Sequence, residues 1–547
     1  MMRVLEPGAR VAQEFGRAMQ ALHQRAGGDA ALAATVGRCA VRAWRAADAG
    51  HVCIDVADAA EREALARSPV VGPSGDPRPL VLDRGALYLH RLWRAETTLA
   101  RAVRALDVEA PLPGAGDPAR VAGEVFGGVD AGDAQQRAVA GALRRRLTVL
   151  SGGPGTGKTT TLARLLVAFA RVAPQARIVY AAPTGKAAAR LAQSLGAQLA
   201  ALDPSGTLRA RLPASGQTVH RLLGARADRR ATGPTVLLDE DLVIVDEASM
   251  LDIELASRLF ASLGPATRLV LAGDRDQLAS VEAGAVFADL CAAPLAGVVV
   301  LGRNYRQQDA PDIAALAAAI RAGSDATLDW PATIALAAPE AVAIVDEALR
   351  AWRAALDAVA AGADAQRVLA AYERHRVLAA MRDGPCGVDA LNAAISLRVR
   401  RRAPGTGGSD WYAGRLAMVT KNEPGLGLFN GDVGVCLPQP GGDVRDGDLM
   451  VAFEGPAGVR LFPVLQLPAC QDAWALTVHK AQGSEFESVA LVPAPAGHAL
   501  ATRELVYTGV TRARRRLSIW GSRAAVEDAA LRPTQRHGRL AGRLAGE

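Results

Sequence analysis

Apolar residues recur at helical spacing in two stretches near the amino terminus, "VAQEFGRAMQALHQ" (11–24) and "ALYLHRLWRAETTLARAVRAL" (86–106). Intervals of three and four residues place such side chains on one face of a helix. The turn-rich segment "SPVVGPSGDPRP" separates the two stretches, and the linker "APLPGAGDPARVAG" follows them. We therefore expect a helical amino-terminal domain over residues 1–121.

The pattern changes after residue 122, where short apolar runs alternate with helical stretches. These runs are "LTVLSG", "RIVYAAPT", "DLVIVDEAS", "TRLVLAGD" and "GVVVLG". An uninterrupted apolar run that is followed by a helix is typical of a parallel strand covered on both faces. The pattern predicts a first α/β domain over residues 122–334.

A second set of these signals is interrupted. Helical spacing covers residues 335–400, and "ESVALV" and "RRLSIWG" indicate buried strands near the carboxyl end. Between them, short strands alternate with glycine turns, which is typical of an antiparallel sheet. We predict a second α/β domain in two parts, 335–410 and 468–547, with a small Src-homology-like β-barrel inserted at 411–467.

Charge and cysteine content narrow the class of protein. The chain of 547 residues has a formal charge of +7, and the stretch from Arg503 to Glu547 holds ten arginines against four acidic residues. This excess favours a polyanionic partner. The six cysteines form no CxxC or Cys/His cluster, so neither a zinc nor an iron–sulfur site is indicated.

The compartment follows from what the amino-terminal pattern lacks. "MMRVLEPGARVAQEF" has no apolar core of signal-peptide length. No charge-free apolar run approaches the roughly 18–20 residues that a membrane helix needs. Scattered cysteines fit a reducing compartment. We expect a cytoplasmic protein with no membrane contact.

A phosphate-binding loop is the strongest chemical signal. Gly152 to Thr159 matches GxxxxGK[ST], follows a predicted strand and opens a predicted helix. Backbone N–H groups of such a loop converge on phosphate oxygens, and the lysine reaches the β- and γ-phosphates as a compact charge. The predicted nucleotide-binding residues here are Gly152, Gly153, Pro154, Gly155, Thr156, Gly157, Lys158, Thr159 and Thr160.

An acidic pair ends a later apolar run, in "LVIVDEASMLD". Asp246 at the strand tip is predicted to hold Mg²⁺ together with Thr159, and Glu247 to polarise the attacking water. Asp–Glu at a strand end is a weak signal alone but a strong one beside a phosphate loop. The predicted cofactors are therefore ATP and Mg²⁺.

Six further motifs appear in one order along the chain. They are "APTGKAAARL", "TVHRLLG", "LAGDRDQLASV", "LGRNYRQ", "ALTVHKAQGSEFESV" and "VYTGVTRARRRL". In this order and spacing the chain resembles the superfamily-one helicases. The resemblance implies two RecA-like motor domains that bind one nucleotide between them.

The resemblance also implies roles for individual nucleotide-site residues. Gln135 would read the adenine, and Tyr305 would stack on it. Gly483 and Glu485 lie where the family holds phosphate and ribose.

Three more residues would act on the γ-phosphate. Gln277 would sense it, while Arg306 and Arg512 would be arginine fingers, the second from the other α/β domain. A finger of this kind contributes about 10³–10⁵ in rate.

The track would be single-stranded nucleic acid, held by phosphate contacts and base stacking. The positions that match the family's DNA contacts are Thr184, Lys186, Thr218 and His220 in the first α/β domain, and Thr477, His479 and Lys480 in the second.

Other stretches resemble the RecD family, the α subunits of exodeoxyribonuclease V (RecBCD): "GHVCID", "LYLHRLWRAE", "GPCGVDALN", "GLGLFNGDVG" and "TQRHGRLAGRL". This resemblance implies 5′-to-3′ DNA unwinding on the 5′-ended strand at duplex ends, in double-strand break repair and homologous recombination. It also implies a heterotrimer with RecB-like and RecC-like subunits.

Two alternatives stay open at this level. The chain could be an assembly or regulatory ATPase subunit of the same complex, or an RNA helicase of the same superfamily.

Overall fold

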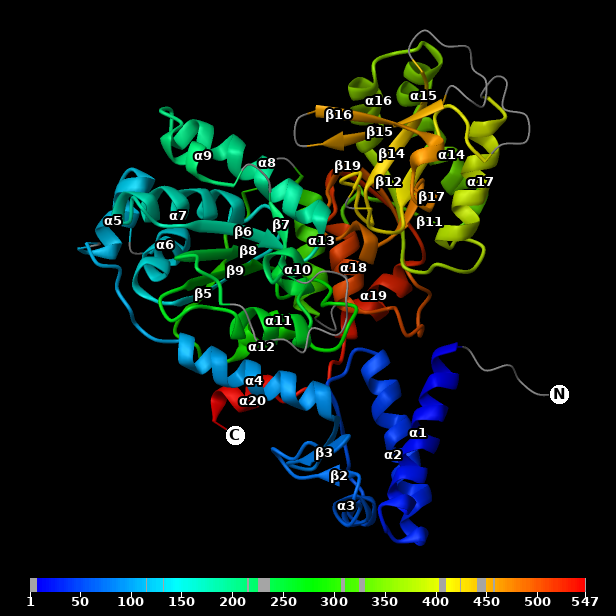
Figure 1. Ribbon diagram of the computed structural model, residues 1–547. Coiled ribbons are helices and arrows are strands. Elements are labelled where there is room, and N and C mark those ends of the chain that lie inside the picture. Colours follow the sequence, from blue (N-terminus) through cyan, green and yellow to red (C-terminus); the bar gives the residue numbers. More distant parts are fainter. Residues whose placement is uncertain are drawn as a thin grey trace, which may run out of the picture.

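The computed structural model describes residues 7–114, 116–130, 132–213, 216–224, 237–305, 310–323, 330–402, 410–423, 425–439, 449–455 and 458–546. Two sheet-bearing lobes lie side by side, and the amino-terminal region extends below them (Figure 1). Among the described residues, no helix is both long and apolar enough to cross a bilayer.

The amino-terminal region combines helices with a small sheet. Its helices are α1 (Pro7–Arg25), α2 (Ala30–Asp48), α3 (Ala59–Ala66) and α4 (His90–Leu106). Helix α5 (Pro118–Phe126), after the linker, lies with the first lobe (Figure 1), where Val121 and Ala122 are buried in the same core as Leu162. The sheet has the order β1–β4–β3–β2, from β1 (Cys53–Asp55), β2 (Val71–Gly72), β3 (Leu80–Asp83) and β4 (Ala86–Leu89).

The sheet adds four short strands to a domain that the sequence predicts to be mostly helical. The first four residues of the predicted helix 86–106 form β4, and the helix begins only at His90. Asp83 pairs with Ala86, which leaves a two-residue loop in which Arg84 and Gly85 both have positive φ. Such a loop matches the twist of a hairpin, so the buried "ALYL" run pairs as a strand.

The first lobe is built on a six-stranded parallel sheet, in the order β10–β5–β9–β8–β6–β7. Its strands are β5 (Leu147–Gly152), β6 (Ile178–Ala182), β7 (Gln217–Thr218), β8 (Leu242–Val245), β9 (Arg268–Gly273) and β10 (Val298–Leu301). Its helices are α6 (Ala134–Arg144), α7 (Lys158–Val172), α8 (Gly185–Leu202), α9 (Thr207–Arg211), α10 (Val219–Leu222), α11 (Ile253–Ala261) and α12 (Val286–Ala292).

The second lobe has a five-stranded parallel sheet, in the order β11–β20–β19–β12–β18. Its strands are β11 (Ala335–Ala337), β12 (His375–Ala379), β18 (Ala475–Thr477), β19 (Phe486–Val492) and β20 (Ala513–Trp520). Its helices are α14 (Ala341–Ala351), α15 (Arg353–Ala360), α16 (Ala365–Glu373), α17 (Val388–Arg400), α18 (Arg503–Val510) and α19 (Arg523–Leu531).

One helix lies across the predicted domain boundary at residue 334. Ile313, Leu316 and Ile320 of α13 (Pro311–Ala322) are buried in the same core as Val489 of β19. Burial thus places α13 with the second lobe, although it precedes residue 334 in the chain.

An antiparallel sheet is inserted between α17 and β18. Its order is β16–β15–β14–β13–β17, with β13 (Leu416–Val419), β14 (Val433–Pro438), β15 (Leu449–Gly455), β16 (Gly458–Pro463) and β17 (Cys470–Asp472). The antiparallel strands agree with the predicted insertion. In the described part of the chain no ladder joins the edge strands β16 and β17, so barrel closure stays a prediction.

The carboxyl-terminal tail returns to the amino-terminal region. Helix α20 (Leu540–Ala545) lies along α4 (Figure 1). Leu540 and Leu544 are buried in the same core as Leu92 of α4 and Phe287 of α12. The carboxyl-terminal tail and the amino-terminal region are therefore packed together on one face of the first lobe.

Candidate nucleotide site and nucleic-acid interface

The phosphate loop lies between β5 and α7, at the carboxyl edge of the first sheet. Gly155 and Gly157 have φ values of +81° and +83°, a conformation that glycine adopts without a steric penalty. Nζ of Lys158 donates to the carbonyls of Gly152 and Gly153. The ammonium is therefore held inside the loop whose N–H groups precede the helix.

Two predicted base-binding residues lie beside this loop. Nε2 of Gln135 donates to the Thr156 carbonyl at 3.3 Å, and the backbone N–H of Tyr305 donates to the Gly155 carbonyl at 2.9 Å. The Tyr305 ring is 43% exposed, and the Arg303 guanidinium lies 4.9 Å from its centroid. An exposed ring and a side-chain amide on one side of the loop can stack on a base and hydrogen-bond to it.

The acidic pair follows β8, on the same edge of the sheet. Partial burial raises the pKa of Asp246, and the neighbouring Glu247 charge acts in the same direction, while Lys158 opposes both. Glu247 has φ of +52° and ψ of +37°. Left-handed backbone at a residue other than glycine costs roughly 1–3 kcal/mol, and such strain concentrates at functional sites.

The second lobe supplies the opposite wall. A Cβ built on Gly483 would lie 3.8 Å from Oε1 of Glu247 and 3.4 Å from Cβ of Ala187. Gly483 has φ of +70°. A larger residue here would therefore be strained and would crowd the acidic pair.

Arg512 belongs to this wall. Its guanidinium is 2% exposed and donates to the carbonyls of Ser484 (3.0 Å) and Thr508 (3.1 Å). The side chain is thus anchored one residue from Gly483, within the second lobe. Its role as an arginine finger stays a prediction.

A third group of residues joins the lobes below the phosphate loop. Asp274, directly after β9, accepts hydrogen bonds from Nε2 of Gln277 (2.9 Å) and from the hydroxyl of Tyr507 on α18 (3.1 Å). The Tyr507 hydroxyl also lies 2.8 Å from a Cβ built on Gly153. Gln277 is therefore connected to both the phosphate loop and the second lobe.

Sequence reasoning missed Tyr507 in this group. It stands inside a motif that was recognised, "VYTGVTRARRRL", but a buried tyrosine on a helix is usually a core residue. Only its pairing with Asp274 across the lobes distinguishes it.

The predicted DNA contacts of the first lobe lie at helix starts. The hydroxyl of Thr184 accepts from the Ala187 N–H and caps α8, and the hydroxyl of Thr218 accepts from the Arg221 N–H and caps α10. His220 is exposed. Both threonines thus have a structural role at a helix start, and their contact with DNA stays a prediction.

Lys186 follows Thr184 and faces charges of the second lobe and its insertion. Burial, and then the positive charge of Arg376, lower the pKa of Lys186 to about 8, while Glu373 and Asp432 act against this. A Cβ built on the adjacent Gly185 would lie 3.0 Å from the ring of Phe429. The inserted segment therefore reaches the start of α8, which sequence spacing did not indicate.

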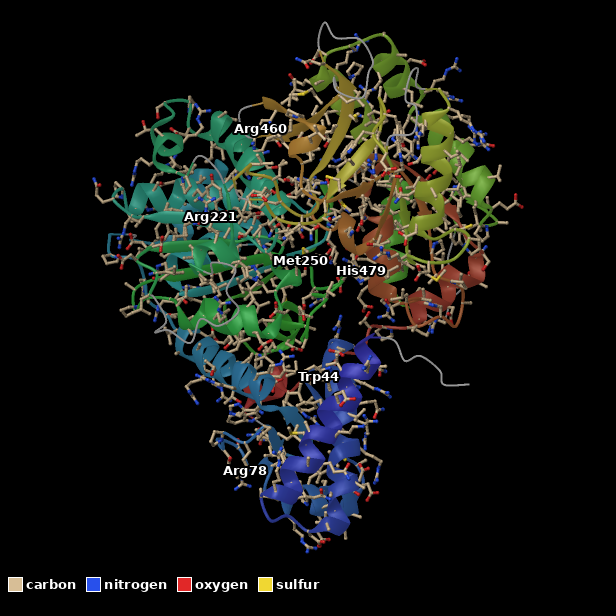
Figure 2. All side chains as sticks on the ribbon, turned by 45° about the vertical axis from the view of Figure 1, so that its right-hand side comes forward. Trp44, Arg78, Arg221, Met250, Arg460 and His479 are labelled. Atoms are coloured by element: carbon tan, nitrogen blue, oxygen red, sulfur yellow. The ribbon has the colours of Figure 1, made fainter. Side chains whose placement is uncertain are left out.

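The predicted contacts of the second lobe follow β18. The hydroxyl of Thr477 accepts from the Lys480 N–H at 3.3 Å. Burial, and then Arg536, lower the pKa of His479, which Figure 2 shows where the two lobes meet. Lys480 is exposed overall. Partial burial of its ammonium, and then the positive charge of Arg382, lower its pKa, while the negative charge of Asp389 raises it.

The described residues do not include every predicted site residue. Arg306 lies outside them, so its role stays a prediction. Among the described residues, no group of three or more His, Cys, Asp and Glu could hold a metal ion. Any metal at the cleft would therefore depend on few protein ligands.

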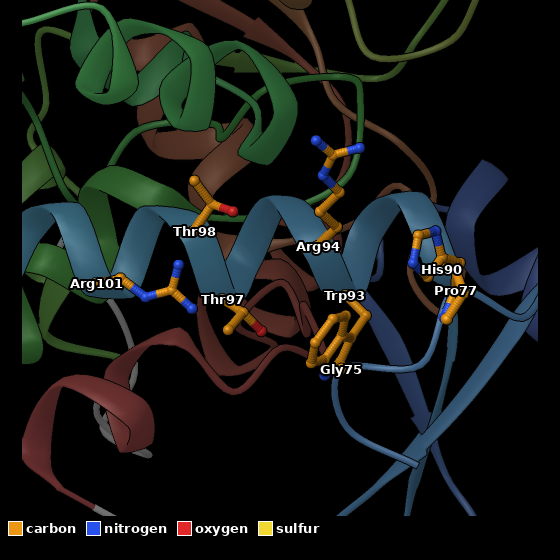
Figure 3. A pocket seen from close by; sticks show the side chains of 8 residues that line it. All are labelled: Gly75, Pro77, His90, Trp93, Arg94, Thr97, Thr98 and Arg101. Atoms are coloured by element: carbon orange, nitrogen blue, oxygen red, sulfur yellow. The ribbon is translucent and has the colours of Figure 1, made fainter. Parts of the chain in front are cut away.

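A hollow of about 420 Å³ lies on α4, away from the phosphate loop. Figure 3 shows that His90, Trp93, Arg94, Thr98 and Arg101 all lie along this helix. The residues that line the hollow include none of the predicted site residues.

Comparisons with known proteins match this arrangement. Residues 130–338 match the model of an AAA domain, and residues 472–520 match that of the UvrD-like helicase C-terminal domain. These two ranges contain the two parallel sheets' central strands and both walls of the cleft.

Relatives extend the match to nearly the whole chain. The RecBCD enzyme subunit RecD of Mycolicibacterium smegmatis is 39% identical over 542 residues, which cover 92% of each chain. The ATP-dependent RecD2 DNA helicase of Deinococcus radiodurans is 34% identical, over 82% of this chain and 57% of its own length. The solved Pif1 helicase of Candida albicans is 17% identical, with a TM-score of 0.42 over 73% of this chain and 96% of its own.

Proposed function

The chain belongs to the RecD family, and from that premise we propose that it is an ATP-dependent helicase that moves along single-stranded DNA. The observation that carries the proposal is the meeting of two lobes at one loop. Lys158 and the Asp246–Glu247 pair come from the first lobe, and Gly483 of the second lobe lies against Glu247. Nucleotide bound there would contact both lobes.

Magnesium is the second part of the proposal. Thr159 and Asp246 offer a hydroxyl and a carboxylate oxygen, the hard ligands that Mg²⁺ takes, and Mg²⁺ is often held by one or two protein groups plus phosphates. Burial, and then the neighbouring Glu247 charge, raise the pKa of Asp246, so a bound cation would stabilise its negative charge. When bound, the ion would neutralise charge on the β- and γ-phosphates.

This chain's own residues supply the remaining steps. Glu247 orients the attacking water, Lys158 binds the γ-phosphate, and Gln277 reports its presence to Tyr507 through Asp274. Arg306 and Arg512 are proposed to stabilise the charge that spreads over the γ-phosphate. Binding and hydrolysis then alternately close and open the cleft.

The direction and partners are also proposals. We propose 5′-to-3′ movement on the 5′-ended strand, within a heterotrimer with RecB-like and RecC-like subunits that acts in double-strand break repair and homologous recombination. The M. smegmatis relative, which carries the name RecBCD enzyme subunit, supports the partners. The cytoplasm is the expected compartment.

Substitution of Lys158 by Gln tests the ATP site. Because the ammonium is lost from the phosphate loop, we expect DNA-stimulated ATP hydrolysis to fall by roughly 10²-fold or more. The measurement is steady-state phosphate release with and without a single-stranded DNA oligonucleotide, with thermal unfolding as the check on folding. Undiminished turnover in a folded Lys158→Gln variant would reject the site.

Displacement assays test the direction. Streptavidin bound at the 3′ end of a biotinylated single strand should be displaced, and streptavidin at the 5′ end should stay. ATP hydrolysis without movement on either strand would favour the regulatory ATPase, and greater stimulation by RNA than by DNA would favour the RNA helicase.

A further inference from the structure

The side chain of Arg190 extends from the first lobe to the second, and both terminal nitrogens of its guanidinium donate hydrogen bonds there. Arg190 lies on α8, one turn after Lys186, and belongs to the first lobe. Its NH1 donates to the Gly483 carbonyl at 2.5 Å, and its NH2 donates to Oε2 of Glu485 at 3.0 Å. Both acceptors belong to the second lobe, so this contact depends on the distance between the lobes.

The contact acts directly beside the acidic pair. Arg190 donates to the carbonyl of Gly483. A Cβ built on this glycine would lie 3.8 Å from Oε1 of Glu247. The positive charge of Arg190 also lowers the pKa of Asp246, against the larger effect of burial. Movement of Arg190 therefore changes both the packing and the field at the acids.

Glu485 has a second arginine partner from its own lobe. Nε of Arg514, on β20, donates to the same Oε2 of Glu485 at 3.1 Å. The Glu485 side chain is 12% exposed, and that of Arg190 is 32% exposed. A buried carboxylate that lost its only cation would carry a large cost, but Arg514 keeps Glu485 paired when Arg190 withdraws. The contact of Arg190 can therefore open cheaply.

The position of Arg190 on α8 links it to the predicted DNA contacts. Thr184 caps this helix, Lys186 lies in its first turn, and Arg190 lies on the next turn. Lys186 and Arg190 lie on consecutive turns of one hydrogen-bonded helix, so a displacement of its first turn would also displace Arg190. DNA bound at the start of α8 would thereby move the guanidinium relative to Gly483 and Glu485.

We propose that Arg190 is a positioning residue that couples DNA binding to ATP hydrolysis, through a reversible two-point contact with Gly483 and Glu485 of the opposite lobe. This proposal rests on the proposed helicase function. Arg190 sets how closely the Gly483 segment lies against Glu247, and Arg514 holds Glu485 in place between cycles.

The test compares Arg190→Gln with a control substitution at another arginine, both in the full-length chain. Arg190→Gln should lower the stimulation of kcat for ATP by a dT oligonucleotide by roughly tenfold, within the usual range of coupling between sites. The nucleotide affinity, measured with a fluorescent ATP analogue without DNA, should change much less than this stimulation. The control is Arg398→Gln, which removes a half-exposed arginine that pairs with Asp346 within the second lobe, and it should leave both the DNA-free ATPase and the stimulation within roughly twofold.

A second variant separates charge from geometry. Arg190→Lys keeps the positive charge, but an ammonium does not reproduce the fork that reaches both acceptors. We expect Arg190→Lys to recover folding without recovering full stimulation by DNA. If it is as stimulated as the parent chain, the two-point contact is not needed and the proposal fails.

The outcomes distinguish this proposal from the proposed function. If the parent chain shows no DNA-stimulated hydrolysis, the proposed function fails first. If the parent is stimulated and Arg190→Gln is stimulated equally, only the coupling role of Arg190 is overturned. Thermal unfolding of each variant shows whether a loss comes from misfolding, and in that case Arg190→Lys decides.

Discussion

The tail clasp and the contacts across the cleft both join parts of the chain that are distant in sequence, but they differ in the burial of their charges. In the tail clasp, formed by Arg536, His537, Arg539 and Arg543, the central guanidinium of Arg543 is 10% exposed and pairs with Glu96 and Asp83, which are 0% and 9% exposed. Across the cleft, the comparable arginine, Arg190, is 32% exposed.

The partners of the clasp are also more completely satisfied. Glu96 accepts from Arg543, from the Tyr88 hydroxyl and from the Arg539 N–H. Although burial raises the pKa of Asp83, hydrogen bonds from Arg543 and Trp93 hold it below the ordinary value. A charge network of this kind is costly to break once formed.

The cleft contacts are fewer and mostly single hydrogen bonds. They are Tyr507 to Asp274, the Leu278 N–H to the Thr508 hydroxyl, Gln482 to the Leu278 carbonyl, and the two bonds of Arg190. A neutral hydrogen bond contributes about 0.5–1.5 kcal/mol. The difference teaches that the carboxyl-terminal tail is fixed to the amino-terminal region by buried charges, while the two lobes are joined by weaker contacts.

Removal of the central guanidinium of the clasp should have the largest effect on stability. Arg543→Ala leaves Glu96 and Asp83 buried without their cation, so we expect the free energy of unfolding to fall by about 3–5 kcal/mol. Urea unfolding followed by tryptophan fluorescence measures this, since Trp93 donates to Asp83.

Arg539→Ala is the matched control in the same tail. Arg539 pairs with Asp55, but these side chains are 45% and 55% exposed, so the loss should stay below about 1 kcal/mol. Equal losses for Arg539 and Arg543 would remove the distinction between a buried clasp and surface pairs.

Removal of one hydroxyl at the cleft should have a smaller effect on stability and a visible one on nucleotide binding. Tyr507→Phe deletes the bond to Asp274, at a cost of about 0.5–1.5 kcal/mol in unfolding free energy. Because the hydroxyl also lies beside Gly153, the KM for ATP should change as well.

Tyr372→Phe is the control for this substitution. The buried Tyr372 hydroxyl donates to the Gly414 carbonyl at the same distance of 3.1 Å, within the second lobe and its insertion. We expect a similar loss of stability with an unchanged KM for ATP. A changed KM in Tyr372→Phe would show that the cleft is not special in this respect.

Titration of Lys186 should have the smallest effect. Its pKa is lowered to about 8, so the ammonium is lost as pH rises through that value, and affinity for single-stranded DNA should fall by roughly threefold between pH 7 and pH 9. Between about pH 8 and pH 10 the unfolded chain binds more protons here than the folded one, so this residue makes folding more favourable as pH rises.

Fluorescence anisotropy of a labelled dT oligonucleotide at constant salt measures this dependence. Lys186→Gln should bind more weakly at pH 7 and show a flatter profile up to pH 9. The same slope in Lys186→Gln and in the parent chain would assign the titration to another group.

In the basic tail, a count of charges does not show how many of the arginines are already paired within the chain. The tail's excess of arginines favoured a polyanionic partner, yet Arg539 and Arg543 pair with the chain's own acids. Arg514 pairs with Glu485, and Arg532 with Asp528. A count of charges contains no information about which acids lie nearby, and Asp55, Asp83 and Glu96 come from residues far away in the chain.

Local patterns were sufficient where neighbours in sequence are also neighbours in space. The glycine-rich loop, its flanking strand and helix, and the parallel strands in both lobes all depend on side-chain periodicity and backbone conformation within short windows. The exceptions are the "ALYL" strand, where one apolar run fits both patterns, and α13, whose core was decided by packing.

The sequence by itself therefore predicted most of the elements and the candidate phosphate-binding, acidic and motif residues, because each pattern lies within a few positions. Tertiary structure alone decided that Arg190 crosses the cleft, that Tyr507 joins Asp274, and that Arg543 closes the tail on Glu96. These pairs are separated by 233 to 447 residues, and only tertiary packing, between the lobes for two of them and between the tail and α4 for the third, brings such distant groups within hydrogen-bonding distance.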